Sequence, residues 1–439
     1  MAATIPPGDP IVACATAWGP AAIAIVRLSG AGLPAILASV CGATPAPRRA
    51  SLRVYRDHDG VIDEGLVTWF PGPGSYTGED LAELSCHGNA LVVERLLAAC
   101  CAAGARMAMP GEFTRRAFLQ GRLDLPRAEA VLQLLSATSA AGVRVARAGL
   151  DGAVSMEAAK VRFELVDVAA ELEAMLDYPG EDLLFSGDEQ LALRLGEVSR
   201  GARAAAASFN AGRFAVEGAR VALVGKVNAG KSTLFNALLG RARALVSAMP
   251  GTTRDVVEAS LQLPTMRVVL LDTAGLRDTT DSVEAEGVAL GQDMAGEADL
   301  RVLVVPVDEE VDRAAWNMLV APRLLVRSFA DRGAVPDLEG LPVCALTGDG
   351  IDRLKEALPA ALRAEAPGDA ALVLASQRQR DDFVAVAAAV DRAVAAFPAG
   401  PAVVVEELYV ALRSLDALVG RDTRETVLDR LFERFCVGK

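Results

Sequence analysis

An eight-residue loop in the middle of the chain constrains the fold more than any other feature. Residues 225–232 read Gly-Lys-Val-Asn-Ala-Gly-Lys-Ser, and they lie between an apolar run at 220–224 and a run of helix-forming residues at 233–239. A GxxxxGKS loop between a strand and a helix turns its backbone N–H groups toward phosphates at the helix N-terminus. The spacing predicts that Lys231 contacts the β- and γ-phosphates of a nucleotide and that the Ser232 hydroxyl ligates Mg²⁺.

The composition and hydrophobic periodicity of the sequence change along the chain. A length of 439 residues suggests roughly three domains. Residues 1–120 mix short apolar runs with Gly and Pro, which predicts an N-terminal α/β domain, whereas residues 121–217 have helical spacing and predict the first part of a helical domain. Residues 218–362 alternate short strands with helices, as a parallel sheet does, and residues 363–439 form the second helical part with a Cys-x-Gly-Lys tail. We therefore expect a multidomain α+β protein in which a P-loop α/β domain is inserted into a helical bundle domain. The strands expected in the inserted domain are 220–224, 266–271, 300–307, 323–328 and 341–345, and the expected helices include 191–214 and 430–439.

Composition excludes several kinds of function. The chain has 44 basic and 57 acidic residues, so its net charge of −13 leaves no broad positive surface for a nucleic-acid backbone. Two histidines are too few for a multi-histidine metal centre, and they argue against a serine–histidine triad. Seven cysteines without a CxxC pair fit a reducing compartment, so we expect a cytoplasmic protein, and no apolar run is long enough to span a membrane. A nucleic-acid substrate would need a partner to help present it.

Two segments after the phosphate loop predict GTP hydrolysis. Residues 251–253 (Gly-Thr-Thr) provide a threonine, Thr253, that can sense the γ-phosphate and ligate Mg²⁺. Residues 272–275 (Asp-Thr-Ala-Gly) have the Asp-x-x-Gly form of a second switch. The residue that follows is Leu276, where Ras-like enzymes carry a water-orienting glutamine. Other groups must therefore guide the attacking water if the site is active, and the loop that follows offers Asp278, Asp281, Glu284 and Glu286 as candidates.

The segments expected to read the base depart from the usual GTPase pattern. Where Asn-Lys-x-Asp is usual, residues 328–331 read Ser-Phe-Ala-Asp, and where Ser-Ala-Lys is usual, residues 344–346 read Cys-Ala-Leu. Asp331 can still accept the N1–H and amino protons of guanine, which adenine cannot offer, so guanine preference should survive with weaker binding. Phe329 either covers a face of the base or is a core aromatic.

The ends of the chain carry a resemblance to a known family. Residues 75–80 (Ser-Tyr-Thr-Gly-Glu-Asp), 110–118 (Pro-Gly-Glu-Phe-Thr-Arg-Arg-Ala-Phe) and 435–439 (Phe-Cys-Val-Gly-Lys), with the inserted GTPase domain, are similar to the MnmE family of tRNA-modification GTPases over essentially the whole chain. The resemblance implies a homodimer whose N-terminal domain binds 5-formyl- or 5,10-methylene-tetrahydrofolate. It also implies a partner, the flavoprotein MnmG, in an expected heterotetramer. Together they would add an aminomethyl or carboxymethylaminomethyl group at C5 of the wobble uridine in tRNA, driven by GTP hydrolysis.

The resemblance also implies roles for individual residues. The expected folate contacts are Arg27, Glu83, Arg122 and Lys439. The expected ligands of a potassium ion that offsets phosphate charge are Asn228, Ser247, Met249 and Thr252, and the magnesium ligands are Ser232 and Thr253. The expected catalytic residues are Asn228, Lys231, the water-activating Glu284 and the tail thiol Cys436. The expected GTP contacts are Asn228, Ala229, Gly230, Lys231, Ser232, Thr233, Ser247, Ala248, Met249, Pro250, Gly251, Thr252, Thr253, Asp272, Thr273, Ala274, Gly275, Ser328, Phe329, Ala330, Asp331, Cys344, Ala345 and Leu346.

The sequence also allows other roles for these residues and other functions for the chain. Asn228 could be a capping residue, Glu284 part of a solvated helix face and Cys436 a tail residue without a role. An Era-like ribosome-assembly GTPase would share the inserted domain but would need a basic RNA-binding appendage, and none is visible. A folate-binding scaffold with a decayed GTPase is the second alternative, because the base-reading segments are altered.

Overall fold

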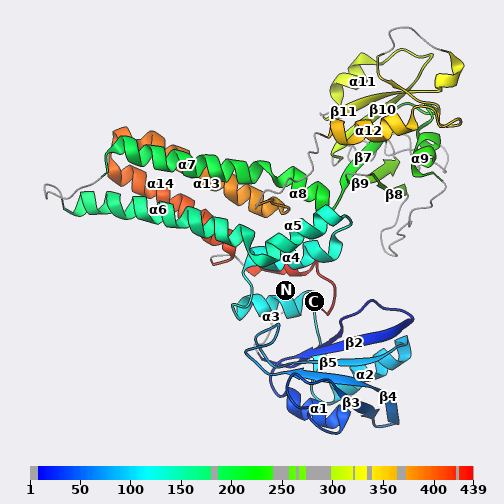
Figure 1. Ribbon diagram of the computed structural model, residues 1–439, viewed down its shortest axis with the longest axis vertical. Helices are drawn as coiled ribbons and strands as arrows, with labels where there is room; N and C mark the ends of the chain where they lie inside the picture. The colour runs from blue at the N-terminus through cyan, green and yellow to red at the C-terminus, as the bar shows by residue number, and fades with distance from the viewer. Residues whose placement is uncertain are drawn as a thin grey trace, which may run out of the picture. The chain divides into compact units, whose positions relative to one another are not determined.

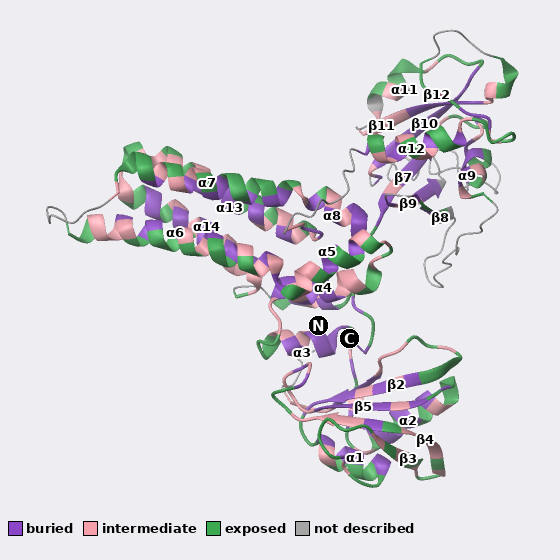
Figure 2. Cartoon of the chain, viewed as in Figure 1, coloured by how far each residue is buried: buried purple, intermediate pink, exposed green. Residues whose placement is uncertain are grey.

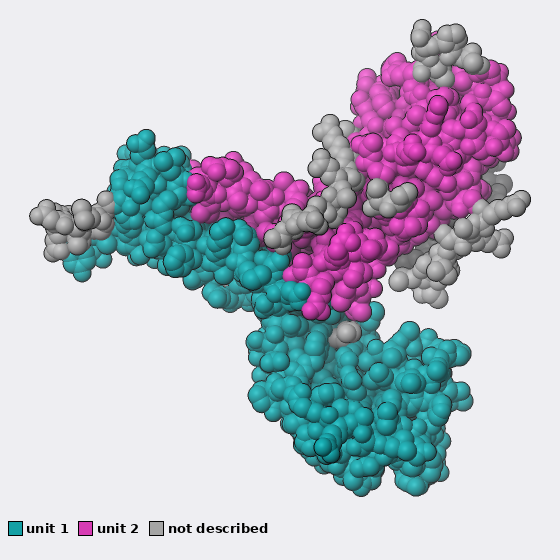
Figure 3. Space-filling model, in the orientation of Figure 1, with its two compact units in different colours: residues 1–132, 150–195, 392–439 teal, residues 133–149, 196–391 magenta. Residues whose placement is uncertain are grey.

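The computed structural model describes residues 8–178, 186–240, 257–263, 266–272, 298–319, 322–333, 339–362, 372–421 and 425–438. The chain divides into two compact units, coloured separately in Figure 3. Unit 1 comprises Met1–Leu132, Leu150–Leu195 and Arg392–Lys439, and unit 2 comprises Gln133–Gly149 and Gly196–Asp391. The expected multidomain fold of mixed helices and sheets is confirmed, and the described part of each unit contains one sheet.

The sheet of unit 1 has six strands in the order β3-β4-β5-β2-β1-β6. The strands are β1 (Ile11–Cys14), β2 (Ala21–Ser29), β3 (Ser51–Asp57), β4 (Gly60–Phe70), β5 (Leu81–Gly88) and β6 (Arg106–Met107). Neighbouring strands are antiparallel except β1 and β6, which are parallel. Because side chains alternate along a strand, Val26 and Leu28 enter the core while Arg27 between them lies on the opposite face.

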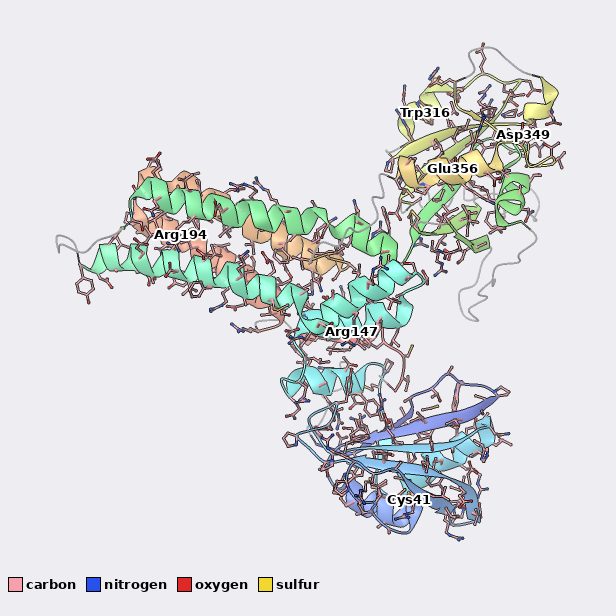
Figure 4. The ribbon with its side chains drawn as sticks, in the orientation of Figure 1. Cys41, Arg147, Arg194, Trp316, Asp349 and Glu356 are labelled. Carbon is pink, nitrogen blue, oxygen red and sulfur yellow. The ribbon has the colours of Figure 1, made fainter. Side chains whose placement is uncertain are left out.

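Helices complete unit 1 and continue into unit 2. Those within unit 1 are α1 (Leu33–Cys41), α2 (Ala90–Ala102), α3 (Glu112–Leu119), α6 (Ala153–Asp177), α14 (Pro401–Val419) and α15 (Glu425–Phe432). Those divided between the units are α4 (Leu125–Ser136), α5 (Ala140–Asp151), α7 (Asp188–Ala207) and α13 (Gln377–Ala396). Helices α6 and α14 lie side by side (Figure 1), and the Tyr409 hydroxyl donates to Glu173 at 2.8 Å between them. Arg194, labelled in Figure 4, pairs with Glu164 at 3.1 Å and so joins α7 to α6.

Two of the expected helices are shorter than predicted. The expected helix 191–214 is interrupted at Ser208, between α7 and α8 (Phe209–Val216). The Ser208 hydroxyl donates to the Ala205 carbonyl and accepts the Leu374 N–H, so local side-chain bonds compete with the helix. The expected helix 430–439 ends as α15 at Phe432, after which the tail is not helical as far as Gly438.

The sheet of unit 2 also has six strands, in the order β12-β11-β10-β7-β9-β8. They are β7 (Ala219–Val224), β8 (Val257–Gln262), β9 (Arg267–Asp272), β10 (Leu300–Pro306), β11 (Arg323–Ser328) and β12 (Leu341–Pro342). The sheet is parallel as predicted, except that β8 is antiparallel to β9. Every residue of β10 is buried, as Figure 2 shows, which is the pattern of a strand covered on both faces. Among the described residues, the helices that lie wholly in this unit are α8, α9 (Lys231–Leu239), α11 (Arg313–Met318) and α12 (Ile351–Ala361).

A charged joint connects α8 to this sheet. Arg213 on α8 forms an ion pair with Asp299, which directly precedes β10. The same carboxylate accepts the Arg220 N–H at 2.8 Å, and the Arg220 carbonyl accepts the Asp299 N–H at 2.8 Å. The guanidinium of Arg213 also lies 4.7 Å from the ring centroid of Phe214. The end of the helix and the start of the sheet are therefore held together by several bonds.

Among the described residues, no helix has the combination of length and apolar character that crossing a membrane requires.

Candidate functional site

The phosphate loop joins β7 to α9, as the sequence predicts. Gly225 has a φ of 148°, and a β-carbon there would lie 2.4 Å from the Val304 carbonyl oxygen, so this position requires glycine. Asn228 adopts left-handed backbone with a φ of 62°, which asparagine tolerates better than most residues. Gly230 is also left-handed and directly precedes α9. The turn thus places the end of the loop at a helix N-terminus.

Lys231 is enclosed by this loop. Its side chain is buried, and the Nζ atom donates to the carbonyl oxygens of Gly225 at 2.9 Å and Lys226 at 2.7 Å. Ser232 and Thr233 follow in the first turn of α9 and are exposed. An ammonium group beside the N–H groups of a helix N-terminus makes a local positive site, which favours a bound anion such as a phosphate.

A pocket lies beside the phosphate loop and brings together most of the residues predicted to read the base. It holds about 300 Å³ of space not filled by atoms, which includes open solvent. It is lined by Gly230, Thr233, Leu234, Ser328, Phe329, Asp331, Val343, Cys344, Ala345 and Leu346. These residues come from the start of α9 and from the carboxyl ends of β11 and β12, where ligands bind in open α/β sheets.

Backbone hydrogen bonds hold the two base-side loops in place. The Ala330 N–H donates to the Val343 carbonyl at 3.1 Å, and the Val343 N–H donates to the Arg327 carbonyl at 2.8 Å. The Cys344 N–H donates at 2.9 Å to the carbonyl of Asp349, a residue labelled in Figure 4. The loop after β11 and the loop after β12 are therefore fixed to each other and form one wall of the pocket.

Phe329 stands on this wall and is not a fully buried core aromatic. It is partly exposed and adopts a φ of 59° and a ψ of 43°, a rare conformation for an aromatic residue. The guanidinium carbon of Arg332 lies 4.0 Å from its ring centroid, and Arg332 also pairs with Asp308 at 3.3 Å. Strained backbone of this kind gathers at functional sites.

Several predicted site residues lie outside the described residues. They are Ser247, Ala248, Met249, Pro250, Gly251, Thr252, Thr253, Thr273, Ala274, Gly275, Leu276, Glu284 and Lys439. Asp272 is described only in its backbone, as the last residue of β9.

A second cluster of predicted residues lies on the sheet of unit 1. Arg27 on β2 and Glu83 on β5 are directly opposite in the antiparallel register, and their side chains form an ion pair at 2.7 Å. Arg27 Nη1 also donates to the Gly438 carbonyl at 3.2 Å. A β-carbon on Gly438 would lie 2.3 Å from the Cys14 carbonyl oxygen, which shows how closely the tail approaches β1. The structure therefore brings the carboxyl-terminal tail to the predicted Arg27–Glu83 pair.

Two other residues predicted for this cluster, Cys436 and Arg122, are both exposed. Cys436 is exposed and lies in the tail two residues before Gly438. Arg122 is exposed, and its stem lies close to Gly78, in the loop before β5. All seven cysteines are within the described residues and are free thiols, as their spacing predicts.

A buried charge network at the start of α3 was not expected from the sequence. Glu112 is fully buried and accepts hydrogen bonds from Arg106 at 2.7 Å and from Arg116 at 2.9 Å. Arg116, itself buried, also pairs with Asp9 and Glu79, each at 2.9 Å. Burial alone would raise the pKa of Glu112, but the hydrogen bonds from Arg106 and Arg116 outweigh burial and hold this pKa below its usual value. The network fixes α3 against the strand that begins at Ile11. The sequence offers only the density of charge in residues 112–116 as a signal for it.

Comparisons with known proteins cover nearly the whole chain. The family model described as GTP-binding protein TrmE N-terminus matches residues 10–122, and the MnmE helical domain model matches residues 125–436. The tRNA modification GTPase MnmE of Akkermansia muciniphila is 40% identical over 450 residues, with 99% of each chain covered. The protein of the same name from Methylobacterium radiotolerans is 42% identical over 440 residues, which cover 98% of this chain and 99% of the relative. Among solved structures, the G domain of the T. maritima FeoB iron transporter is 23% identical, with 33% of this chain and 98% of that chain covered, at a TM-score of 0.26.

Proposed function

Because the chain belongs to the MnmE family of tRNA modification GTPases, we propose that it hydrolyses GTP and uses this cycle to modify tRNA. The proposed product carries an aminomethyl or carboxymethylaminomethyl group at C5 of the wobble uridine. The proposed partner is the flavoprotein MnmG, the one-carbon source is 5-formyl- or 5,10-methylene-tetrahydrofolate, and the protein acts as a homodimer in the cytoplasm. Family models that span both ends of the chain favour this function over an Era-like ribosome-assembly role.

The enclosure of Lys231 by a strand–loop–helix turn is the observation that carries the GTPase assignment. The ammonium group of Lys231 donates hydrogen bonds to the loop carbonyls of Gly225 and Lys226. It therefore lies within the loop that is expected to bind the nucleotide phosphates. The exposed hydroxyl of Ser232 is a suitable oxygen ligand for Mg²⁺, and the exposed amide of Asn228 is a suitable oxygen ligand for K⁺. When bound, these cations would offset the negative charge that develops on the transferred phosphoryl group.

The chain's own residues are proposed to complete the hydrolytic site. Ser247, Met249 and Thr252 would join Asn228 around the potassium ion, and Thr253 would join Ser232 at the magnesium ion. Since Leu276 cannot orient water, Glu284 is proposed to accept a hydrogen bond from the attacking water and hold it in line. Residues 272–275 would follow the γ-phosphate as the second switch.

The Arg27–Glu83 pair supports the folate part of the proposal. Both side chains are partly exposed and so can be reached by a ligand. Glu83 can accept hydrogen bonds from the amidine-like edge of a pterin while Arg27 holds this carboxylate in place. Arg122 and Lys439 can meet the carboxylates of the glutamate tail. Cys436 lies in the same tail as Gly438, which Arg27 contacts, and its thiolate is proposed to assist one-carbon transfer.

The proposed function is tested by analysing wobble uridines in tRNA from a strain that lacks this chain. We expect the C5 substituent to be missing, restored by the unchanged chain, and not restored by Lys231→Ala or Glu83→Gln. A control variant, Glu94→Gln at an exposed position on α2, should restore it fully. Wobble uridines that stay modified without the chain would contradict the proposal. Restoration by Lys231→Ala would instead favour the folate-binding scaffold with a decayed GTPase.

A further inference from the structure

The serine at the end of β11 has a fixed hydrogen-bond partner. Ser328 is buried, and its hydroxyl oxygen lies 2.7 Å from the carbonyl oxygen of Ala229 in the phosphate loop. A carbonyl can only accept, so the serine must donate to it, and a hydroxyl has a single hydrogen to give. The side chain therefore ties β11 to the phosphate loop and has no donor left for a nucleobase.

The lack of a free donor on Ser328 affects base recognition, because guanine has two different hydrogen-bonding edges. One edge carries the N7 and O6 acceptors, and the other carries the N1–H and amino donors. The usual asparagine at position 328 has two amide hydrogens, enough for the phosphate loop and for N7 at once. The serine present here can serve only the loop.

The pocket does offer an acceptor for the other edge of the base. Asp331 lines the pocket from the turn that follows β11, and an ionised carboxylate accepts hydrogen bonds only. Among the other described side chains of the pocket, Cys344 is buried and its thiol is only a weak donor, and Thr233 lies on the α9 side.

The ring of Phe329 offers a surface for a base contact that would not depend on these edges. The Phe329 ring approaches the end of the phosphate loop, since a β-carbon on Gly230 would lie 3.2 Å from the ring edge. Arg332 covers the ring at 4.0 Å and is held in turn by Asp308. An aromatic ring beside a base contributes stacking to every purine alike.

We propose that this nucleotide site does not sense N7 of guanine, because Ser328 is committed to the Ala229 carbonyl. Base recognition then depends on the N1–H and amino edge, for which Asp331 is the expected acceptor. This inference rests on the proposed function and specifies the chemistry of its base recognition. It distinguishes the chain from GTPases with asparagine at this position.

The test measures the dissociation constants of GTP, 7-deaza-GTP and ITP with the full-length protein. 7-Deaza-GTP lacks the N7 acceptor, and we expect it to bind within about twofold of GTP. ITP lacks the amino group that Asp331 would hold, and we expect it to bind about tenfold more weakly or worse.

Substitutions at Ser328 give the matched comparison. Ser328→Asn supplies a second donor and should create a preference for GTP over 7-deaza-GTP of about threefold to tenfold. Ser328→Ala removes the bond to Ala229 but adds no donor, so both nucleotides should weaken together and their ratio should stay near one. Glu94→Gln, at an exposed position on α2 away from the pocket, should leave the ratio unchanged as well.

The possible outcomes separate this inference from the function on which it rests. A wild-type protein that binds GTP but binds 7-deaza-GTP fivefold or more weakly overturns the inference and leaves the proposed function standing. A ratio that stays at one in a folded Ser328→Asn variant also overturns it. A protein that binds no guanine nucleotide refutes the proposed GTPase and the inference together.

Discussion

At Asn228, the requirement for a left-handed backbone can be tested separately from the proposed role of the side chain as a cation ligand. Its left-handed conformation disfavours alanine, so a loss of activity in Asn228→Ala would mix backbone strain with the loss of a ligand. Glycine adopts this conformation freely, and Asn228→Gly therefore removes only the side chain.

We predict that GTP turnover depends on potassium through this side chain. The unchanged protein should turn over GTP about a hundredfold faster in K⁺ than in Na⁺, the size of effect that one electrostatic contact to a transition state can have. Asn228→Gly should reduce the rate in K⁺ to about the rate in Na⁺. Asn228→Asp, which keeps an oxygen ligand, is the control and should retain part of the difference. Equal rates in the two salts for the unchanged protein would exclude the potassium role.

For single residues, the sequence predicts only those parts of the site whose residues are close together along the chain. The residues of the phosphate loop lie next to one another, so their spacing alone predicts the turn around Lys231. The Ser328–Ala229 bond joins residues 99 positions apart, and the bond from Arg116 to Asp9 joins residues 107 apart. Neither periodicity nor motif spacing contains such pairs. The partial exposure of Phe329 likewise depends on a backbone conformation that no propensity predicts.

Among the elements, buried strands were the easiest to predict. Strands β7, β9, β10 and β11 appear in the sequence as short apolar runs because helices cover both faces of a parallel sheet. The antiparallel strand β8 mixes polar and apolar residues, and it was not among the expected strands. β12 is shorter than expected, since it ends at Pro342 and residues 343–345 belong to the loop that lines the pocket.

Helix α3 is held by buried charge as well as by the burial of Phe113 and Ala117. We predict that Glu112→Gln destabilises the contact between α3 and β1 by about 3 kcal/mol, because it leaves buried guanidinium charge poorly compensated. Amide hydrogen exchange, followed across residues 8–29 and 106–119, should show the loss as faster exchange. The exposed Glu94→Gln serves as control and should change stability by less than about 0.5 kcal/mol. Unchanged exchange in Glu112→Gln would show that the network is not stabilising.

The network should also be sensitive to acid. Burial opposes the charged forms of Asp9 and Glu112, but the bonds from Arg106 and Arg116 prevail and lower both pKa values in the folded protein. A lowered pKa stabilises the fold above the ordinary carboxyl pKa of about 4, and this stabilisation disappears as the pH falls through the folded-state values. Protection of α3 should therefore fall steeply below about pH 4 in the unchanged protein and less steeply in Glu112→Gln.

For the whole molecule, the net charge of −13 sets how tRNA can be bound. An acidic chain releases few counterions from RNA, so the electrostatic part of binding should be small. We predict that the protein alone binds tRNA with a dissociation constant no tighter than about 10⁻⁶ M at physiological salt, and more tightly once the proposed flavoprotein partner is added. Filter binding at two salt concentrations with and without the partner measures both. Submicromolar binding by the chain alone would contradict the expectation.

The joint at Asp299 gives a way to watch the nucleotide site at a distance. Because one carboxylate holds both the guanidinium of Arg213 and the backbone of β7, α8 cannot rotate freely about the two residues that separate it from the sheet. A fluorescent label at position 210, an exposed Asn on α8, would then move together with the strands to which this helix is bonded. Its anisotropy and distance to a second label would report changes in the sheet when nucleotide is added, without any probe placed in the pocket.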